Sequence, residues 1–131
     1  MRVLVVDDDP ASRHILAAQL AGVADCVPCG SGAEAVDAVK AAIAVDTPFD
    51  VVFLDIIMPH MDGHETLNHI RLAEQEGGLP PARQVRAVMV TSMDDEANTM
   101  AALFDGQVSA YLTKPPNKAE LLHKLETLGL L

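Results

Sequence analysis

The chain has 131 residues, enough for one domain with a buried core, and half of these residues are apolar. With 9 Lys and Arg against 19 Asp and Glu, the formal net charge is −10, which argues against direct nucleic-acid binding because phosphates require a basic surface. No segment approaches the ~18 apolar residues of a membrane span and no signal-peptide pattern precedes the first strand, so we expect one cytoplasmic domain over residues 1–131.

Strand-like and helix-like patterns alternate five times along the chain. Strands are expected near residues 2–6, 24–29, 50–54, 85–90 and 108–112. Helices are expected near residues 10–21, 31–44, 63–76, 95–105 and 117–128. Capping residues precede three of these helices, namely Asp9, Ser31 and Asn117. Because continuous aliphatic strands are typical of parallel sheets covered on both faces, the alternation predicts an α/β fold, (βα)5, with a doubly wound five-stranded sheet.

Three of the predicted strands are followed by charged side chains. Asp7 and Asp8 follow the first strand, Asp55 the third and Lys114 the fifth. The C-terminal ends of parallel strands meet at one edge, so we expect these groups to converge. Two carboxylates about 4 Å apart repel by roughly 4 kcal/mol at an effective dielectric near 20, and Mg²⁺ would offset this. The pattern predicts a site for a divalent cation and an anionic group, with helix capping as the simpler alternative.

Four motifs connect the chain to a known family. They are Val5-Val6-Asp7-Asp8, Leu54-Asp55-Ile56-Ile57-Met58-Pro59 with Met61-Asp62-Gly63, Val90-Thr91-Ser92, and Tyr111-Leu112-Thr113-Lys114-Pro115. In this order and spacing they resemble the receiver domains of bacterial response regulators over essentially the whole chain. The resemblance implies a flavodoxin-like fold with strand order 2-1-3-4-5. It also implies a stand-alone phosphoacceptor switch of a two-component or phosphorelay system, and not an enzyme.

The resemblance further implies roles for residues at the predicted sheet edge. Asp55 would accept a phosphoryl group from a sensor histidine kinase or phosphotransfer protein. Asp7, Asp8 and Asp55, with the backbone carbonyl of Ile57, would hold Mg²⁺. These roles agree with the chemistry of phosphoryl transfer, which needs a nucleophile and strong neutralisation of charge.

The remaining family positions concern the response to phosphorylation. Thr91 would hydrogen-bond the acquired phosphoryl group and Lys114 would pair with it. A shift of the Thr91 hydroxyl would leave space for Tyr111, although Tyr111 is also interpretable as an ordinary strand aromatic. The output would then be contact with a downstream protein through the face of the fourth helix, fifth strand and fifth helix; a homodimer is left open. Ile57 and Met93, apolar where many family members are polar, are hypothesised to shield Asp55 from hydrolytic water.

Two patterns suggest other kinds of site. Cys26 and Cys29 have redox spacing just before a helix N-terminus, which would stabilise a thiolate. Residues three apart in a strand point to opposite faces, however, so two small apolar residues are the simpler interpretation. His60 and His64 would in principle ligate a transition metal, but they bracket a turn and a solvated loop pair is favoured.

Two enzyme classes are the alternatives to a phosphoacceptor switch. The segment 30–35 matches the dinucleotide fingerprint G-x-G-x-x-A, with Asp55 at about the expected distance. It follows the second strand and not the first, and it leaves the acids of the first strand and the lysine unexplained. An aspartyl phosphatase would also use Asp55, Mg²⁺ and a lysine. Such hydrolases typically carry a second acid where this chain has Ile57, which favours stable acceptance over turnover.

Overall fold

The computed structural model of the chain describes residues 1–91 and 108–131. Its strands are β1 (Arg2–Val6), β2 (Asp25–Cys29), β3 (Val51–Asp55), β4 (Arg86–Thr91) and β5 (Ala110–Thr113). Its helices are α1 (Pro10–Leu20), α2 (Gly32–Ala44), α3 (Gly63–Glu76), α5 (Lys118–Thr127) and the short 3-10 helix η1 (Pro81–Arg83). The predicted strands and four of the predicted helices agree with these bounds to within two residues. The helix predicted at 95–105 lies outside the described residues.

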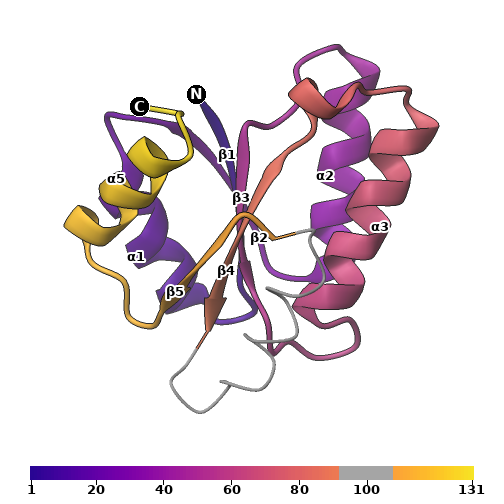
Figure 1. The fold of residues 1–131 in the computed structure, drawn as a ribbon. Coiled ribbons are helices and arrows are strands. Elements are labelled where there is room, and N and C mark those ends of the chain that lie inside the picture. Colours follow the sequence, from indigo (N-terminus) through magenta and orange to yellow (C-terminus); the bar gives the residue numbers. More distant parts are fainter. Residues whose placement is uncertain (92–107) are drawn as a thin grey trace.

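The sheet is parallel throughout and has the order β2-β1-β3-β4-β5. Helices α1 and α5 cover one face and α2 and α3 the other (Figure 1). This is the predicted doubly wound, flavodoxin-like arrangement. Because the strand order reverses at β1, with β2 on one side and β3 on the other, a crevice is expected where β1 and β3 end. Among the described residues, no helix is both long and apolar enough to cross a membrane.

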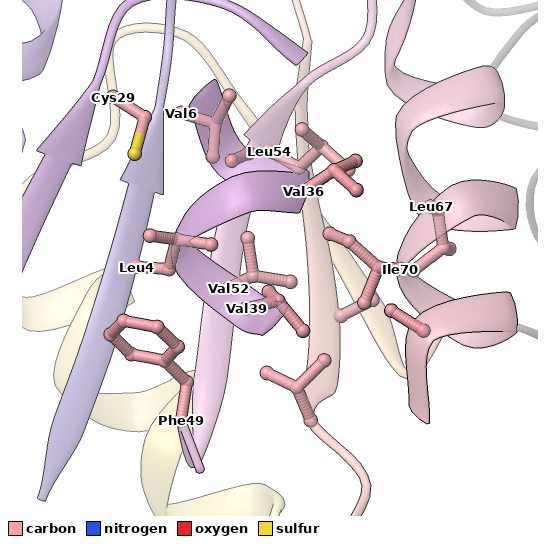
Figure 2. Packing of buried hydrophobic residues seen from close by; sticks show 14 of the residues in the cluster. Leu4, Val6, Cys29, Val36, Val39, Phe49, Val52, Leu54, Leu67 and Ile70 are labelled. Atoms are coloured by element: carbon pink, nitrogen blue, oxygen red, sulfur yellow. The ribbon is translucent and has the colours of Figure 1, made fainter. Parts of the chain in front are cut away.

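The sheet separates two apolar clusters, and this explains the uninterrupted aliphatic runs in the sequence. In β1, Leu4 and Val6 belong to the cluster beneath α2 and α3, and Val3 and Val5 belong to the cluster beneath α1 and α5. Figure 2 shows the first cluster, in which Ile70 of α3 lies against the strands. Since both faces of β1 and β3 are covered, the charged side chains after these strands are held at the rim of the core.

The two cysteines of β2 lie on opposite faces of the sheet. Cys26 packs against the cluster beneath α1 and α5, while Cys29 is part of the cluster beneath α2 and α3. Both are free thiols. Burial raises the pKa of each, in the case of Cys29 to about 11, so both stay protonated at neutral pH. The structure therefore supports two small apolar residues and argues against a redox pair.

The helix starts use the predicted capping chemistry. A side-chain oxygen of each predicted cap accepts a hydrogen bond from a backbone N–H in the first turn of its helix, as seen for Asp9, Ser31 and Asn117. Asp62 caps α3 in the same way. The start of α2 differs in one detail, because the Glu34 carboxylate accepts the N–H of Gly30 and not that of the cap residue. Because Asp9 caps α1, the helix begins directly after Asp7 and Asp8, and this fixes the path of the chain beyond these two acids.

Candidate functional site

Three strands deliver charged side chains to one point of the sheet edge. Asp7 and Asp8 follow β1, Asp55 ends β3, and Lys114 follows β5. The three acids each offer a carboxylate oxygen, and these oxygens lie within 4.8 Å of one another. The Lys114 Nζ lies 2.8 Å from Asp7 Oδ2 and 3.1 Å from Asp55 Oδ2. The structure thus brings together the four charged residues that the sequence placed at strand ends.

The site combines buried and accessible carboxylates. Asp7 and Asp55 are only 6% and 7% exposed, whereas Asp8 is exposed to solvent. Such a set of carboxylate oxygens, partly open to water, suits a hard divalent cation such as Mg²⁺, which keeps several waters when it binds proteins. Within residues 1–91 and 108–131 this is the only cluster of three or more side chains able to ligate a metal. The arrangement therefore fits Mg²⁺ through its donor chemistry.

The start of α3 packs closely against the backbone of Asp55 and Ile56 at the end of β3. The Gly63 N–H donates to the Ile56 carbonyl at 2.7 Å. A Cβ atom on Gly63 would lie 2.5 Å from the carbonyl oxygen of Asp55, closer than any side chain can be placed. Only glycine therefore allows the N-terminus of α3 to pack directly on the residue that ends β3.

Burial and neighbouring charges set the protonation of the site. Burial raises the pKa of Asp55 to about 6, the ion pair with Lys114 opposes this rise, and the nearby Asp7 adds to it. For Lys114, burial lowers the pKa, but hydrogen bonds to the two carboxylates outweigh burial and hold it above its usual value. Asp55 thus gives up its proton less readily than an exposed aspartate, and a cation beside it favours the ionised form.

The other predicted positions surround this cluster. Thr91 ends β4 with 3% exposure, and its carbonyl accepts the Lys114 N–H at 2.7 Å. Ile57 is 54% exposed and Tyr111 is 39% exposed. Met93 lies outside the described residues. The roles assigned to the carbonyl of Ile57, to Tyr111 and to Met93 stay predictions.

The histidines flanking the turn before α3 do not extend the metal cluster. His60 is exposed and adopts a left-handed backbone with φ of 69°. His64 is half-buried, and its Nε2 has no hydrogen-bond partner among the described residues. Neither belongs to a group of three or more metal-ligating side chains in the part of the chain that the structure describes. His60 lies in the loop, as predicted, but His64 lies in the first turn of α3 and is half-buried, so the prediction of a solvated loop pair is wrong for His64.

The glycine-rich start of α2 has a structural explanation. A Cβ atom on Gly32 would lie 2.2 Å from the Thr66 Oγ1 of α3, so this glycine allows α2 and α3 to approach. The Glu34 carboxylate accepts the Gly30 N–H at 2.6 Å and places negative charge where a bound pyrophosphate would lie. Both observations argue against a dinucleotide site.

One contact of the site was not expected from the sequence. The guanidinium Nη1 of Arg13, in α1, donates to the backbone carbonyl of Asp7 at 2.8 Å. The available signal was a basic residue five positions after Asp8 in a chain with only 9 Lys and Arg. That spacing becomes informative only once the direction in which α1 leaves β1 is known.

The fold and this charged edge define a class of protein: a flavodoxin-like domain with a cation site and a lysine for an anionic group between β1, β3 and β5. The chain matches the family model described as response regulator receiver domain over residues 3–126. It therefore belongs to the response regulator receiver domain family. Members of this family serve as phosphoacceptors in two-component signalling and act as switches, not as classical enzymes.

Individual relatives agree with this assignment. The chain is 33% identical over 128 residues to the transcriptional regulatory protein AruR of Pseudomonas aeruginosa, covering 97% of this chain and 48% of AruR. It is 36% identical over 126 residues to the signal transduction histidine-protein kinase BarA of Shigella flexneri, covering 95% of this chain and 12% of BarA. The chain thus spans about half or less of the length of these relatives.

A solved structure shows the same fold. The receiver domain of the histidine kinase CKI1 from Arabidopsis thaliana, complexed with Mg²⁺ and BeF₃⁻, superimposes with a TM-score of 0.78. The two chains are 28% identical, and the match covers 95% of this chain and 89% of that chain. A related domain with Mg²⁺ bound agrees with the donor chemistry of the acidic cluster here.

Proposed function

We propose that Asp55 is the phosphoacceptor of this receiver domain, and that a histidine kinase or phosphotransfer protein is the donor. The observation that carries this proposal is the position of its carboxylate. It ends β3, lies 3.1 Å from the Lys114 ammonium and lies within 4.8 Å of Asp7 and Asp8. Because such donors are charged from ATP, we place the protein in the cytoplasm.

The geometry of Asp55 and Lys114 supports one reaction in particular. A carboxylate oxygen of Asp55 attacks the phosphorus of a phosphohistidine, a new O–P bond forms, and the N–P bond breaks with its electron pair left on the imidazole, which takes up a proton. Mg²⁺ bound by Asp7 and Asp8 would neutralise charge on the transferred group. Lys114, whose Nζ lies 3.1 Å from the attacking carboxylate of Asp55, would pair with the new phosphoryl oxygens.

Thr91 and Tyr111 would transmit the modification. Strands β4 and β5 are paired in register, with Met89 opposite Tyr111 and Thr91 opposite Thr113. Movement of the Thr91 hydroxyl toward the phosphoryl group would therefore act on the strand that carries Tyr111. We propose that phosphorylation changes the affinity of the face formed by β5 and α5 for a downstream protein. The fourth helix that the sequence predicts beside this face lies outside the described residues. A second copy of the chain is one candidate for this partner.

Intact-mass analysis tests the acceptor. The protein is incubated with acetyl phosphate and Mg²⁺, and we expect a single phosphoryl adduct that is lost in Asp55→Asn and in the presence of a chelator. Asp62→Asn is the matched control, because Asp62 lies in the same loop and asparagine can still accept the Glu65 N–H that Asp62 accepts. An adduct that persists in Asp55→Asn would reject Asp55 as the acceptor.

Ile57 is proposed to lengthen the life of the phosphorylated state, together with Met93. Two observations support this proposal: Ile57 lies two residues after Asp55, and its side chain is 54% exposed and so accessible to water near the site. Replacing both residues by asparagine should shorten the phosphoryl half-life about threefold, which corresponds to a barrier change of about 0.65 kcal/mol. Leu72→Asn in α3, where the side chain is 52% exposed, is the control. An unchanged half-life in the double variant would count against shielding.

A further inference from the structure

Arg13 reaches back from α1 to the loop that carries the acids. It lies in the second turn of the helix, yet its Nη1 donates to the carbonyl of Asp7, the residue directly after β1, at 2.8 Å. The side chain is half-buried, so it is held against the protein and does not extend into solvent. The carbonyl of Asp7 belongs to no helix or strand, and the guanidinium supplies the donor that regular structure would otherwise supply.

This contact completes the fixation of Asp7. Its N–H donates to the Cys29 carbonyl at 3.2 Å, its Oδ1 accepts the Asp9 N–H at 2.9 Å, and its Oδ2 accepts the Lys114 ammonium at 2.8 Å. With Arg13 on the carbonyl, each polar atom of Asp7 has a partner. The hydrogen bond from Arg13 therefore holds the peptide group that joins Asp7 to Asp8, and with it the backbone that carries the Asp8 side chain.

The guanidinium is itself confined by the neighbouring loop. A Cβ atom on Gly30 would lie 3.1 Å from the Nη1 of Arg13. Gly30 is itself fixed by the Glu34 carboxylate, which accepts the Gly30 N–H at 2.6 Å. Arg13 thus lies between the loop after β1 and the loop after β2, and a larger side chain at position 30 would force it to move.

We propose that Arg13 is a positioning residue for the cation site, which holds the Asp7-Asp8 turn in the geometry that binds Mg²⁺. This inference rests on the proposed function, in which Asp7 and Asp8 ligate the metal. Residues that orient metal ligands typically contribute 10–100-fold to affinity. Arg13 acts through the backbone of a ligand residue, so an effect of about tenfold is expected.

The charge of Arg13 and its positioning role predict opposite changes in Mg²⁺ affinity when Arg13 is replaced, which makes the inference testable. A cation beside three carboxylates opposes the binding of a second cation, so electrostatics alone predicts that removing Arg13 tightens Mg²⁺ binding. Loss of a hydrogen bond that fixes the ligand loop predicts weaker binding. A change in Mg²⁺ affinity upon Arg13→Met therefore distinguishes the two effects by its direction.

The experiment is calorimetric titration of the whole chain with Mg²⁺. We expect Arg13→Met to weaken binding about tenfold, and Arg13→Lys, which keeps a charge and a donor, to fall between Arg13→Met and the wild type. Arg83→Met is the control for charge, because Arg83 pairs with Asp46 in a different part of the molecule, and its affinity should stay near that of the wild type. Equal or tighter binding by Arg13→Met would overturn the inference.

A second measurement separates positioning from general damage to the fold. Hydrogen exchange without metal should be faster at the Asp9 N–H in Arg13→Met, because this group bonds to Asp7 Oδ1, and unchanged at the Glu65 N–H of the α3 cap. Unchanged exchange at Asp9 would contradict the inference. If the wild type itself binds no Mg²⁺, the cation site fails and the role of Arg13 fails with it. If the wild type binds Mg²⁺ and Arg13→Met binds it equally well, the cation site stands and only the role of Arg13 is rejected.

Discussion

At the scale of single residues, Asp55 is a carboxyl group that the fold keeps away from water. Its burial opposes ionisation and raises its pKa to about 6, although Lys114 lies 3.1 Å away. The lysine does not fully compensate, because it also donates to Asp7 at 2.8 Å. An ionised Asp55 is therefore less stable in the folded protein than in the unfolded chain. A cation at this position relieves the imbalance, which connects the burial of Asp55 with its proposed chemistry.

This imbalance predicts a pH-dependent stability. Because the folded-state pKa of about 6 lies above the ordinary 3.8, the folded protein holds this proton more tightly, and the contribution of Asp55 to the free energy of unfolding falls as the pH rises through that interval. Without divalent cations, Asp55→Asn should raise the free energy of unfolding at pH 7.5 by about 1–3 kcal/mol, and by less at pH 5. Urea unfolding at both pH values measures this.

The control for this prediction is an exposed acid. Asp37 of α2 is exposed to solvent, so Asp37→Asn should change the free energy of unfolding little at either pH. Two results would contradict the predicted cost of the ionised carboxylate. One is that Asp55→Asn is no more stable than the wild type at pH 7.5. The other is that it raises the free energy of unfolding as much at pH 5 as at pH 7.5.

At the scale of elements, α3 is joined to β4 by a buried carboxylate. Glu74 is 1% exposed, and its Oε2 accepts the N–H of Val85, which precedes β4, at 2.6 Å. Its Oε1 lies 2.7 Å from Arg71, which also donates to the Val85 carbonyl at 2.8 Å. The pair therefore fixes where β4 begins after the proline-containing loop. The placement of β4 in turn determines where Thr91 meets the site.

Removing this carboxylate should destabilise the protein. Glu74→Ala leaves the buried Val85 N–H without its acceptor and breaks the ion pair with Arg71, so we expect a loss of about 2–4 kcal/mol in the free energy of unfolding. Glu76→Ala is the control, because Glu76 is exposed at the end of the same helix and should change stability by less than about 0.5 kcal/mol. Equal stabilities of the two variants, measured by urea unfolding, would show that the buried carboxylate contributes nothing.

At the scale of the whole molecule, the sequence predicted what depends on local pattern. The aliphatic runs before Asp7, Asp55 and Lys114 identify buried parallel strands, and parallel strands place their ends at one edge. Strand order and site location followed from these runs and from the motifs around them. The contacts of Arg13 and Glu74 did not follow, because each depends on how a helix packs against a loop that is not its sequence neighbour. Their residue types alone are compatible with an ordinary solvated surface.

The charge of the molecule is consistent with a protein partner. A formal net charge of −10 leaves few basic residues, and the structure places Lys114 and Arg13 at the acidic site. Arg13 thus donates to the backbone of Asp7, and Lys114 pairs with the carboxylates of Asp7 and Asp55. A phosphoryl group on Asp55 would contact Lys114 in an otherwise acidic site. The proposed output through protein contact agrees with this distribution of charge.

The proposed function requires that Asp55 itself becomes an aspartyl phosphate, and locating the phosphoryl group in the chain tests this. The phosphorylated protein is reduced with borohydride, which converts an aspartyl phosphate into homoserine, and is then mapped by peptide mass spectrometry. We expect homoserine at position 55 only, and only when the protein was phosphorylated in the presence of Mg²⁺. Homoserine at position 7 or 8, or a phosphoryl group recovered on a histidine with Asp55 unmodified, would contradict it.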